Sequence, residues 1–165
     1  MHEATLCIPV KEGPILEVLM GETIGGMRPG TINFSGGKVN SAEMLDSPEV
    51  RRKKCASREL YEEIAVRVAA EDWQEVADLT FRWPKKMPWD QRVFVYMSRT
   101  WSGTPTASSE LRPIWVPVNA IQYEKMWPAD KLWLPHVLAG KYVTGSFVYD
   151  RSKSLIAHEI RPRPL

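Results

Sequence analysis

The segment from Ser47 to Ile64 carries the strongest helix signal in the chain and limits the folds that the chain can form. Ser47 suits the N-cap, Pro48 suits the first helical position, and Glu49 follows in the first turn, where negative charge is favourable. Apolar residues then fall on one broad side of the helical wheel, namely Val50, Ala56, Leu60, Tyr61 and Ile64. A helix with one apolar side needs a further layer, such as a sheet, to cover it.

The rest of the chain is divided by turn residues into short runs that are typical of strands. We expect strands at 5–10, 15–20, 79–83, 92–100, 114–118, 142–149 and 155–160. A second, shorter helix is predicted at 131–138, where Pro135 limits or kinks it. The glycine-rich segment 21–37 is predicted to be a loop with a short extended piece near 31–34, and 161–165 to be a loose tail. No internal repeat or linker is visible, so residues 1–165 predict one domain of mixed α and β structure.

Composition excludes several other classes of protein. The 165 residues carry 22 Lys and Arg against 20 Asp and Glu, and a net charge of +2 is too small to indicate a nucleic-acid polymer or a membrane surface as partner. A hydrophobic content of 44% excludes global disorder. No run approaches the about 20 apolar residues of a membrane span, and no secretory signal is visible. Two cysteines make neither a disulfide framework nor a metal site, so a cytoplasmic location is expected.

Three carboxylates share one face of the predicted helix. Glu59, Glu62 and Glu63 are spaced three and four positions apart, so they repel one another unless a cation lies among them. A hard divalent cation, Mg²⁺ or alternatively Mn²⁺, prefers such oxygen ligands. The alternative interpretation is a solvated helix face paired with Lys or Arg. Gly36 and Gly37 lie upstream, and a glycine pair lets the backbone approach a metal ion or a phosphate closely.

These residues resemble a known motif. Gly37, Glu43 and the run Arg58-Glu59-Leu60-Tyr61-Glu62-Glu63-Ile64-Ala65-Val66 are similar to the Nudix box, G-x5-E-x7-R-E-U-x-E-E-x-G-U. The resemblance implies an α+β fold, the Nudix α/β/α sandwich with a mixed central sheet, in which the box forms a loop-helix-loop at about 37–66. It also implies an enzyme that binds divalent metal and cleaves a nucleoside diphosphate linked to another group.

Two departures from the box stand out. Fourteen residues rather than seven separate Glu43 from Arg58. The excess equals nearly two helical turns, so we expect an insertion around 46–54 that lengthens the start of the helix and leaves its acidic face intact. Either Glu43 or Glu49 then meets that face. Ala65 replaces the glycine near the end of the box, which is costly where the position needs a positive φ.

The resemblance also implies roles for individual residues. Metal binding falls to Gly37, Glu59, Glu62, Glu63 and Glu110, with Mg²⁺ as the expected ion and Mn²⁺ as the alternative. Glu62 or Glu63 helps to activate water, Arg58 orients a glutamate by an ion pair, and Glu110 is a further metal ligand or base.

A narrower resemblance concerns the substrate. Segments 32–39, 111–115, 126–135 and 145–147 are similar to the MutT-type oxidised-purine nucleoside triphosphatases within the Nudix family. This implies that Asn33 hydrogen-bonds the purine, that Trp127 stacks on it, and that Asp130 reads its edge, with Ala129 replacing a second family aspartate. Two more aromatic residues, Phe81 and Trp83, match the pocket lining. The other tryptophans considered are expected to serve packing: Trp73, Trp101 and Trp115.

The resemblances together imply a Mg²⁺-dependent pyrophosphohydrolase. Its substrate would be a small nucleotide, an oxidised or otherwise modified purine nucleoside triphosphate, converted to the monophosphate and pyrophosphate. Two alternatives stay open: a Nudix hydrolase for a nucleotide sugar or a dinucleoside polyphosphate, and a nucleotide-binding module without catalysis. The modified base, the choice between ribose and deoxyribose, and the oligomeric state are left open. The basic run 51–54 is expected to be a solvated helix face, and Cys55 a buried thiol.

Overall fold

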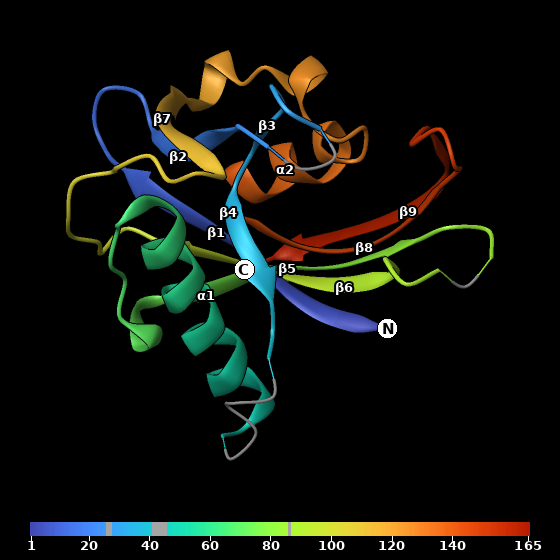
Figure 1. The fold of residues 1–165 in the computed structure, drawn as a ribbon, viewed down its shortest axis with the longest axis horizontal. Coiled ribbons are helices and arrows are strands. Elements are labelled where there is room, and N and C mark those ends of the chain that lie inside the picture. The colour runs from blue at the N-terminus through green and yellow to red at the C-terminus, as the bar shows by residue number, and fades with distance from the viewer. Residues whose placement is uncertain (26–27, 41–45, 86) are drawn as a thin grey trace.

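Two helices lie on opposite faces of a mixed β-sheet in the computed structural model (Figure 1), which describes residues 1–25, 28–40, 46–85 and 87–165. The helices are α1, Pro48–Ile64, and α2, Asp130–Leu138. The described strands are β1 (His2–Lys11), β2 (Glu17–Thr23), β3 (Ile32–Asn33), β4 (Ser35–Lys38), β5 (Gln74–Arg82), β6 (Gln91–Ser98), β7 (Leu111–Pro117), β8 (Lys141–Tyr149) and β9 (Leu155–Pro164). Neither described helix is long and apolar enough to cross a membrane.

The strand order is β3-β2-β1-β6-β5-β8-β9, while β4 pairs with β1 and β7 pairs with β2. The β1–β6 and β5–β8 pairs are parallel, and the other pairs between these strands are antiparallel. The sheet is therefore mixed, as the Nudix resemblance predicts.

Strand alternation divides the interior into two cores. Along β6, Val93 and Val95 point into the core that α2 covers, whereas Phe94 and Tyr96 point into the core that α1 covers. The buried side of α1 consists of Cys55, Ala56, Leu60 and Ile64, and that of α2 includes Trp133, Leu134 and Val137. This layering confirms the predicted α/β/α sandwich.

The signals at the start of α1 hold in the structure. The Ser47 Oγ accepts a hydrogen bond from the Val50 N–H at 3.4 Å, and Pro48 opens the helix. The expected insertion at 46–54 coincides with this first part of α1 and stays a prediction. Ala65 ends the helix with a φ of 61° and a ψ of 24°, which is the left-handed conformation that glycine adopts most easily.

The prediction of a loop across 21–37 is wrong at its start, where β2 continues to Thr23, and at its end, which forms β4. Strand β4 pairs with β1 there, placing Gly36 opposite Leu6 and Gly37 opposite Thr5. A Cβ on Gly36 would lie 1.9 Å from the Thr5 carbonyl oxygen, so only glycine permits this pairing. Glycines that suggested a loop therefore serve the close approach of two strands.

The predicted loose tail is also wrong. Strand β9 continues to Pro164, with Pro162 opposite Val143 and Pro164 opposite Lys141. This strand ends the sheet order, so its prolines need no second partner for the missing N–H groups.

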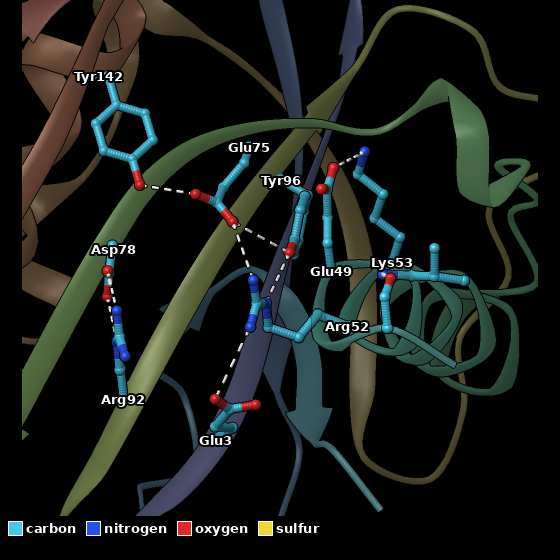
Figure 2. Close-up of polar contacts among 11 residues, drawn as sticks. Glu3, Glu49, Arg52, Lys53, Glu75, Asp78, Arg92, Tyr96 and Tyr142 are labelled. Carbon is cyan, nitrogen blue, oxygen red and sulfur yellow. Dashed lines mark hydrogen bonds and ion pairs between the residues drawn. The ribbon is translucent and has the colours of Figure 1, made fainter. Parts of the chain in front are cut away.

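The basic run 51–54 is not uniformly a solvated face. Arg52, whose side chain is only 15% exposed, points from α1 onto the sheet (Figure 2). Its guanidinium lies 3.8 Å from the Phe94 ring centroid, and its Nε donates to the Tyr96 hydroxyl at 3.3 Å. Lys53 pairs with Glu49 instead, at 2.7 Å along the helix.

Glu75 on β5 is the centre of the same polar network (Figure 2). It lies 3.9 Å from Arg52 and accepts hydrogen bonds from Tyr96 at 3.3 Å and Tyr142 at 2.7 Å. Glu3 on β1 lies 3.8 Å from Arg52 on the other side. The network ties the first half of α1 to four strands of the sheet, β1, β5, β6 and β8.

The tryptophans that we expect to serve packing do so. Trp73 is buried and its Nε1 donates to the Ser57 hydroxyl at 2.9 Å. Trp101 donates to the Val10 carbonyl at 2.9 Å and packs against Trp115, with ring centroids 5.1 Å apart.

Candidate active site

A cavity of about 500 Å³ brings together most of the predicted site residues. Strands β1, β4, β5 and β6, the end of α1 and the start of α2 contribute to its wall. The predicted residues that line it are Asn33, Gly37, Glu63, Phe81, Trp83, Glu110, Trp127 and Asp130. The acidic and the aromatic members therefore share one space.

Glu63 dominates the acidic end. The Gly36 N–H donates to its Oε1 at 3.2 Å, which holds the carboxylate against β4. The pKa of Glu63 is raised to about 7, mainly by burial; that hydrogen bond opposes the rise, and the like charges of Glu59 and Glu110 add to it. Gly37 provides the space for Glu59, because a Cβ there would lie 2.3 Å from the Glu59 Cδ.

Arg58 holds the other two carboxylates beside the cavity. Its Nη1 lies 2.9 Å from Glu59 Oε1 and 3.2 Å from Glu62 Oε2, the latter on a side chain that is 55% exposed. Arg58, Glu59 and Glu62 are not part of the cavity wall. The predicted orienting ion pair is therefore formed, and Glu62 is the most peripheral of the box glutamates.

The donor set matches a hard divalent cation in its chemistry. Its members are carboxylates, which such a cation prefers as ligands. Burial is the largest cause that raises the pKa of Glu63 and Glu59, and repulsion among the carboxylates adds to it. Within the described residues, however, no three His, Cys, Asp or Glu side chains are already arranged as metal ligands. Arg58 instead donates hydrogen bonds to the carboxylates of Glu59 and Glu62.

The structure describes only one of the two candidates for a further box glutamate. Glu49 pairs with Lys53 in the first turns of α1 (Figure 2), and it does not line the cavity. Glu43 lies outside the described residues.

The aromatic end is built around Tyr149 at the end of β8. The centroid of its ring lies 5.4 Å from Trp127, 5.6 Å from Trp83 and 6.2 Å from Phe81. Trp127 meets Tyr149 edge-on, whereas Phe81 stacks nearly parallel to it. Such a cluster of flat rings suits a planar heterocycle.

Two polar side chains accompany these rings. Asp130 is buried, and its Oδ1 accepts a hydrogen bond from the Trp133 Nε1 at 2.9 Å. Burial raises the pKa of Asp130 to about 7. Asn33 accepts the Phe34 N–H through Oδ1 at 2.8 Å. Ala129, at the position of the second family aspartate, is fully buried and donates its N–H to the Tyr149 hydroxyl at 3.0 Å.

The sequence patterns do not point to two further residues that contact Trp127. Tyr149 shares a face with Phe147 through strand alternation, a signal that was available but does not distinguish pocket from core. Arg28 lies with its guanidinium 4.5 Å from the Trp127 ring centroid, and its buried Nη1 has no hydrogen-bond partner in the described part of the chain. Nothing in the local sequence around Arg28 signals that contact.

Comparison with known proteins agrees with this geometry. The NUDIX domain family model matches residues 2–137. A Mus musculus protein named oxidized purine nucleoside triphosphate hydrolase is 29% identical over 147 residues, which cover 87% of this chain and 86% of that protein. A Danio rerio protein of the same name is 28% identical over 156 residues, 94% of this chain and 92% of that protein.

Solved structures show the same fold. The crystal structure of a mutator MutT protein from Bacillus halodurans superposes with a TM-score of 0.80 at 21% identity, over 99% of this chain and 100% of that one. The NUDIX domain of Shewanella oneidensis NrtR, solved with ADP ribose, gives a TM-score of 0.54 at 14% identity over 71% and 73% of the two chains. The chain belongs to the Nudix family and is a Nudix hydrolase.

Proposed function

We propose that this hydrolase is a metal-dependent pyrophosphohydrolase of oxidised or otherwise modified purine nucleoside triphosphates. One observation carries the proposal: a single cavity has Glu63, Gly37 and Glu110 at its acidic end, Trp127 and Asp130 at its aromatic end, and Asn33 in its wall. A nucleotide has the same polarity, with a planar base at one end and phosphates at the other. The names of the mouse and zebrafish relatives favour the same substrate class.

Nudix hydrolases generally need divalent metals, and the residues that would hold Mg²⁺, or alternatively Mn²⁺, are Glu59, Glu62, Glu63 and Glu110 with the Gly37 carbonyl. A bound divalent cation polarises a phosphoryl oxygen and lowers the pKa of water. Arg58 fixes the carboxylates of Glu59 and Glu62 in one orientation. Glu62 or Glu63 helps to activate the attacking water by accepting its proton.

The reaction is a hydrolysis of one phosphoanhydride bond. The water oxygen bonds to the α-phosphorus, the bond from that phosphorus to the bridging oxygen breaks, and pyrophosphate leaves with the bonding electrons. The products are the nucleoside monophosphate, pyrophosphate and a proton.

At the other end of the cavity, Trp127 supplies a stacking face, and Asn33 and Asp130 supply hydrogen-bonding groups for the base edge. Ala129 has no side-chain hydrogen-bonding group, so the edge readout differs from that implied for the family. A chain with only two cysteines fits the reducing cytoplasm that we propose as the location.

A nucleotide panel tests the proposal. Oxidised and plain purine nucleoside triphosphates are compared at fixed Mg²⁺, with chromatographic detection of monophosphate and pyrophosphate. We expect pyrophosphate release with the highest kcat/KM on a modified purine. Binding without turnover of any member would favour the non-catalytic alternative, and release of orthophosphate would contradict the assigned bond.

Two variants test the roles proposed for the acidic and the aromatic end of the cavity. Glu63→Gln is expected to lower kcat by several orders of magnitude, whereas Glu71→Gln, an exposed acidic residue outside the cavity, should leave it unchanged. Trp127→Ala is expected to raise KM by about tenfold or more, since base stacking is lost. An unchanged KM would remove Trp127 from the base site.

A further inference from the structure

Arg28 begins a tight turn between β2 and β3. The Thr31 N–H and the Thr31 hydroxyl both donate to the Arg28 carbonyl, at 3.4 and 2.7 Å, and Gly30 has a φ of 82°. Pro29 followed by Gly30 at the centre is typical of a type II turn. Two hydrogen bonds of 2.8 Å join the turn to β2, from the Gly30 N–H to the Thr23 carbonyl and from the Thr23 N–H to the Thr31 carbonyl. The backbone that carries Arg28 is therefore well fixed.

The side chain of Arg28 covers one face of Trp127 from outside the active-site cavity. Its guanidinium carbon lies 4.5 Å from the centroid of the indole ring, a distance typical of a cation stacked on an aromatic face. The described wall of the cavity includes Trp127 but not Arg28. A base cannot stack on a face that the guanidinium already covers, so the purine has to use the side of the ring that faces the cavity.

The guanidinium of Arg28 is partly buried at the aromatic end. Its Nη1 is buried and has no hydrogen-bond partner in the described part of the chain, which is unfavourable for a donor and calls for a compensating interaction. Burial raises the pKa of Asp130 and of Tyr149, and the positive charge of Arg28 opposes both rises. The charge therefore lies near the residues that surround Trp127, and the described side-chain contact of the guanidinium is with Trp127 itself.

We propose that Arg28 is a positioning residue, which holds the Trp127 ring in the orientation in which its cavity side stacks on the purine. The proposal rests on the proposed function, because the purine is assigned to Trp127 there. A tryptophan side chain turns about two bonds, and a ring that is already immobilised loses less conformational freedom when the base binds. Arg28 lies over one face of the ring and Tyr149 meets the ring edge-on with centroids 5.4 Å apart, so its rotation is restrained.

A direct contact with the substrate phosphates is the other use that a cation at this place would have. Arg28 lies near Asp130 at the aromatic end, whereas the phosphates are assigned to the end that holds Glu63 and Glu110. Its guanidinium is also outside the described cavity wall. The geometry therefore favours an effect that is transmitted through Trp127.

A double-mutant cycle tests this transmission. KM and kcat are measured at fixed Mg²⁺ for the wild type, Arg28→Met, Trp127→Ala and the double variant, on the purine nucleoside triphosphate that has the highest kcat/KM. We expect Arg28→Met to raise KM about three- to tenfold and to change kcat less than about twofold, because the acidic end keeps its residues. In the Trp127→Ala background the same substitution should raise KM no further. Arg28→Lys should recover part of the affinity, since an ammonium group also binds over an indole face.

Arg161→Met is the matched control, because it removes an exposed arginine on β9 outside the cavity and should leave KM and kcat unchanged. An unchanged KM in Arg28→Met would overturn the positioning role and leave the proposed function in place. An equal rise in KM with and without Trp127 would do the same. If that rise also weakens with increasing salt, Arg28 binds the phosphates directly.

Calorimetric titration separates the positioning role from the proposed function. The same four proteins are titrated with the same nucleotide in the presence of Mg²⁺. If no triphosphate is hydrolysed but Arg28→Met weakens binding only when Trp127 is present, the proposed function is contradicted and the role of Arg28 in base binding is supported.

Discussion

At the scale of single residues, Ala65 holds the backbone in a conformation that its side chain disfavours. Its φ of 61° closes α1, and its N–H donates to the Tyr61 carbonyl at 2.9 Å. Relief of the left-handed penalty exceeds the extra chain entropy of glycine, so Ala65→Gly should raise the free energy of unfolding by about 0.5–1 kcal/mol. Urea unfolding measures the change. Ala157→Gly, on an exposed strand position without positive φ, should have the opposite sign, and equal signs would contradict the argument.

Asp130 links stability to pH at the same scale. Its pKa is raised by burial from 3.8 to about 7, so the folded protein binds a proton that the unfolded chain has released. Stability is therefore lost as pH rises through this window, by at most about 1.4 kcal/mol per pH unit. Asp130→Asn removes the titration and keeps an oxygen for Trp133. We expect the variant to gain stability relative to wild type between pH 4 and about 7, measured by urea unfolding. Parallel pH profiles for the two proteins would contradict this.

The motif resemblance selects residues that the structure brings together, but not how they are arranged. Asn33, Trp127 and Asp130 are chosen on that resemblance, and they line one cavity. Glu62 lies outside the cavity wall because of the rotation of α1 and its ion pair with Arg58. Both follow from packing rather than from the spacing of residues in the sequence. The contact of Arg28 with Trp127 joins segments far apart in the chain, so no local pattern reports it.

At the scale of elements, Arg52 anchors the first half of α1 to the sheet. It joins Glu3, Glu75 and Tyr96, and its guanidinium lies over Phe94 (Figure 2). Arg52→Met leaves the half-buried Glu75 carboxylate without its cation and should lower the free energy of unfolding by about 1–3 kcal/mol. Hydrogen exchange should then report faster opening of the first turns of α1, because the acidic end of the helix keeps its own contacts.

Lys53→Met is the matched control on the same helix. It removes the exposed pair with Glu49, which is worth about 0.3–0.5 kcal/mol. Equal destabilisation by the two variants would show that the Arg52 network has no special part in docking α1.

The sequence predicts helices and strands that have a periodic pattern of side chains, but not strands whose residues are explained only by pairing with a particular neighbour. The cap residues placed the start of α1 at Pro48, and alternating runs located most strands. The glycines of β4 predict a loop, although they serve the close approach to β1. The prolines at the end of β9 disfavour a strand except at a sheet edge, and edge position is a property of the whole sheet.

At the scale of the whole molecule, the sheet joins two cores that each hold one end of the candidate site. The core under α1 supports the helix that carries Glu59 and Glu63, whereas the core under α2 contains Trp133 and Phe147, next to Asp130 and Phe81. The cavity lies where both cores meet β1, β4 and β6. Substitutions at one end should therefore leave the other end folded.

Metal binding at the acidic end should reverse the sign of a stability effect. Without metal, Glu63 is a half-buried carboxylate beside Glu59 and Glu110, and its pKa of about 7 lies above the 4.5 of the unfolded chain. The Glu63 carboxyl therefore costs stability progressively as pH rises from about 4.5 through 7, and Glu63→Gln should be more stable than wild type at pH 8 in the presence of EDTA. Saturating Mg²⁺ should instead stabilise wild type, by about 2.7 kcal/mol at a hundredfold excess over Kd, and the variant much less.

Thermal unfolding at pH 8 with EDTA or with Mg²⁺ measures both effects without any turnover. Glu71→Gln, which is exposed and outside the cavity, should follow wild type in both conditions. Because the same carboxylate destabilises the metal-free fold and stabilises the metal-bound one, the ranking of wild type and Glu63→Gln should invert on addition of Mg²⁺. An unchanged ranking with equal stabilisation by Mg²⁺ would place the metal elsewhere and remove Glu63 from its ligands.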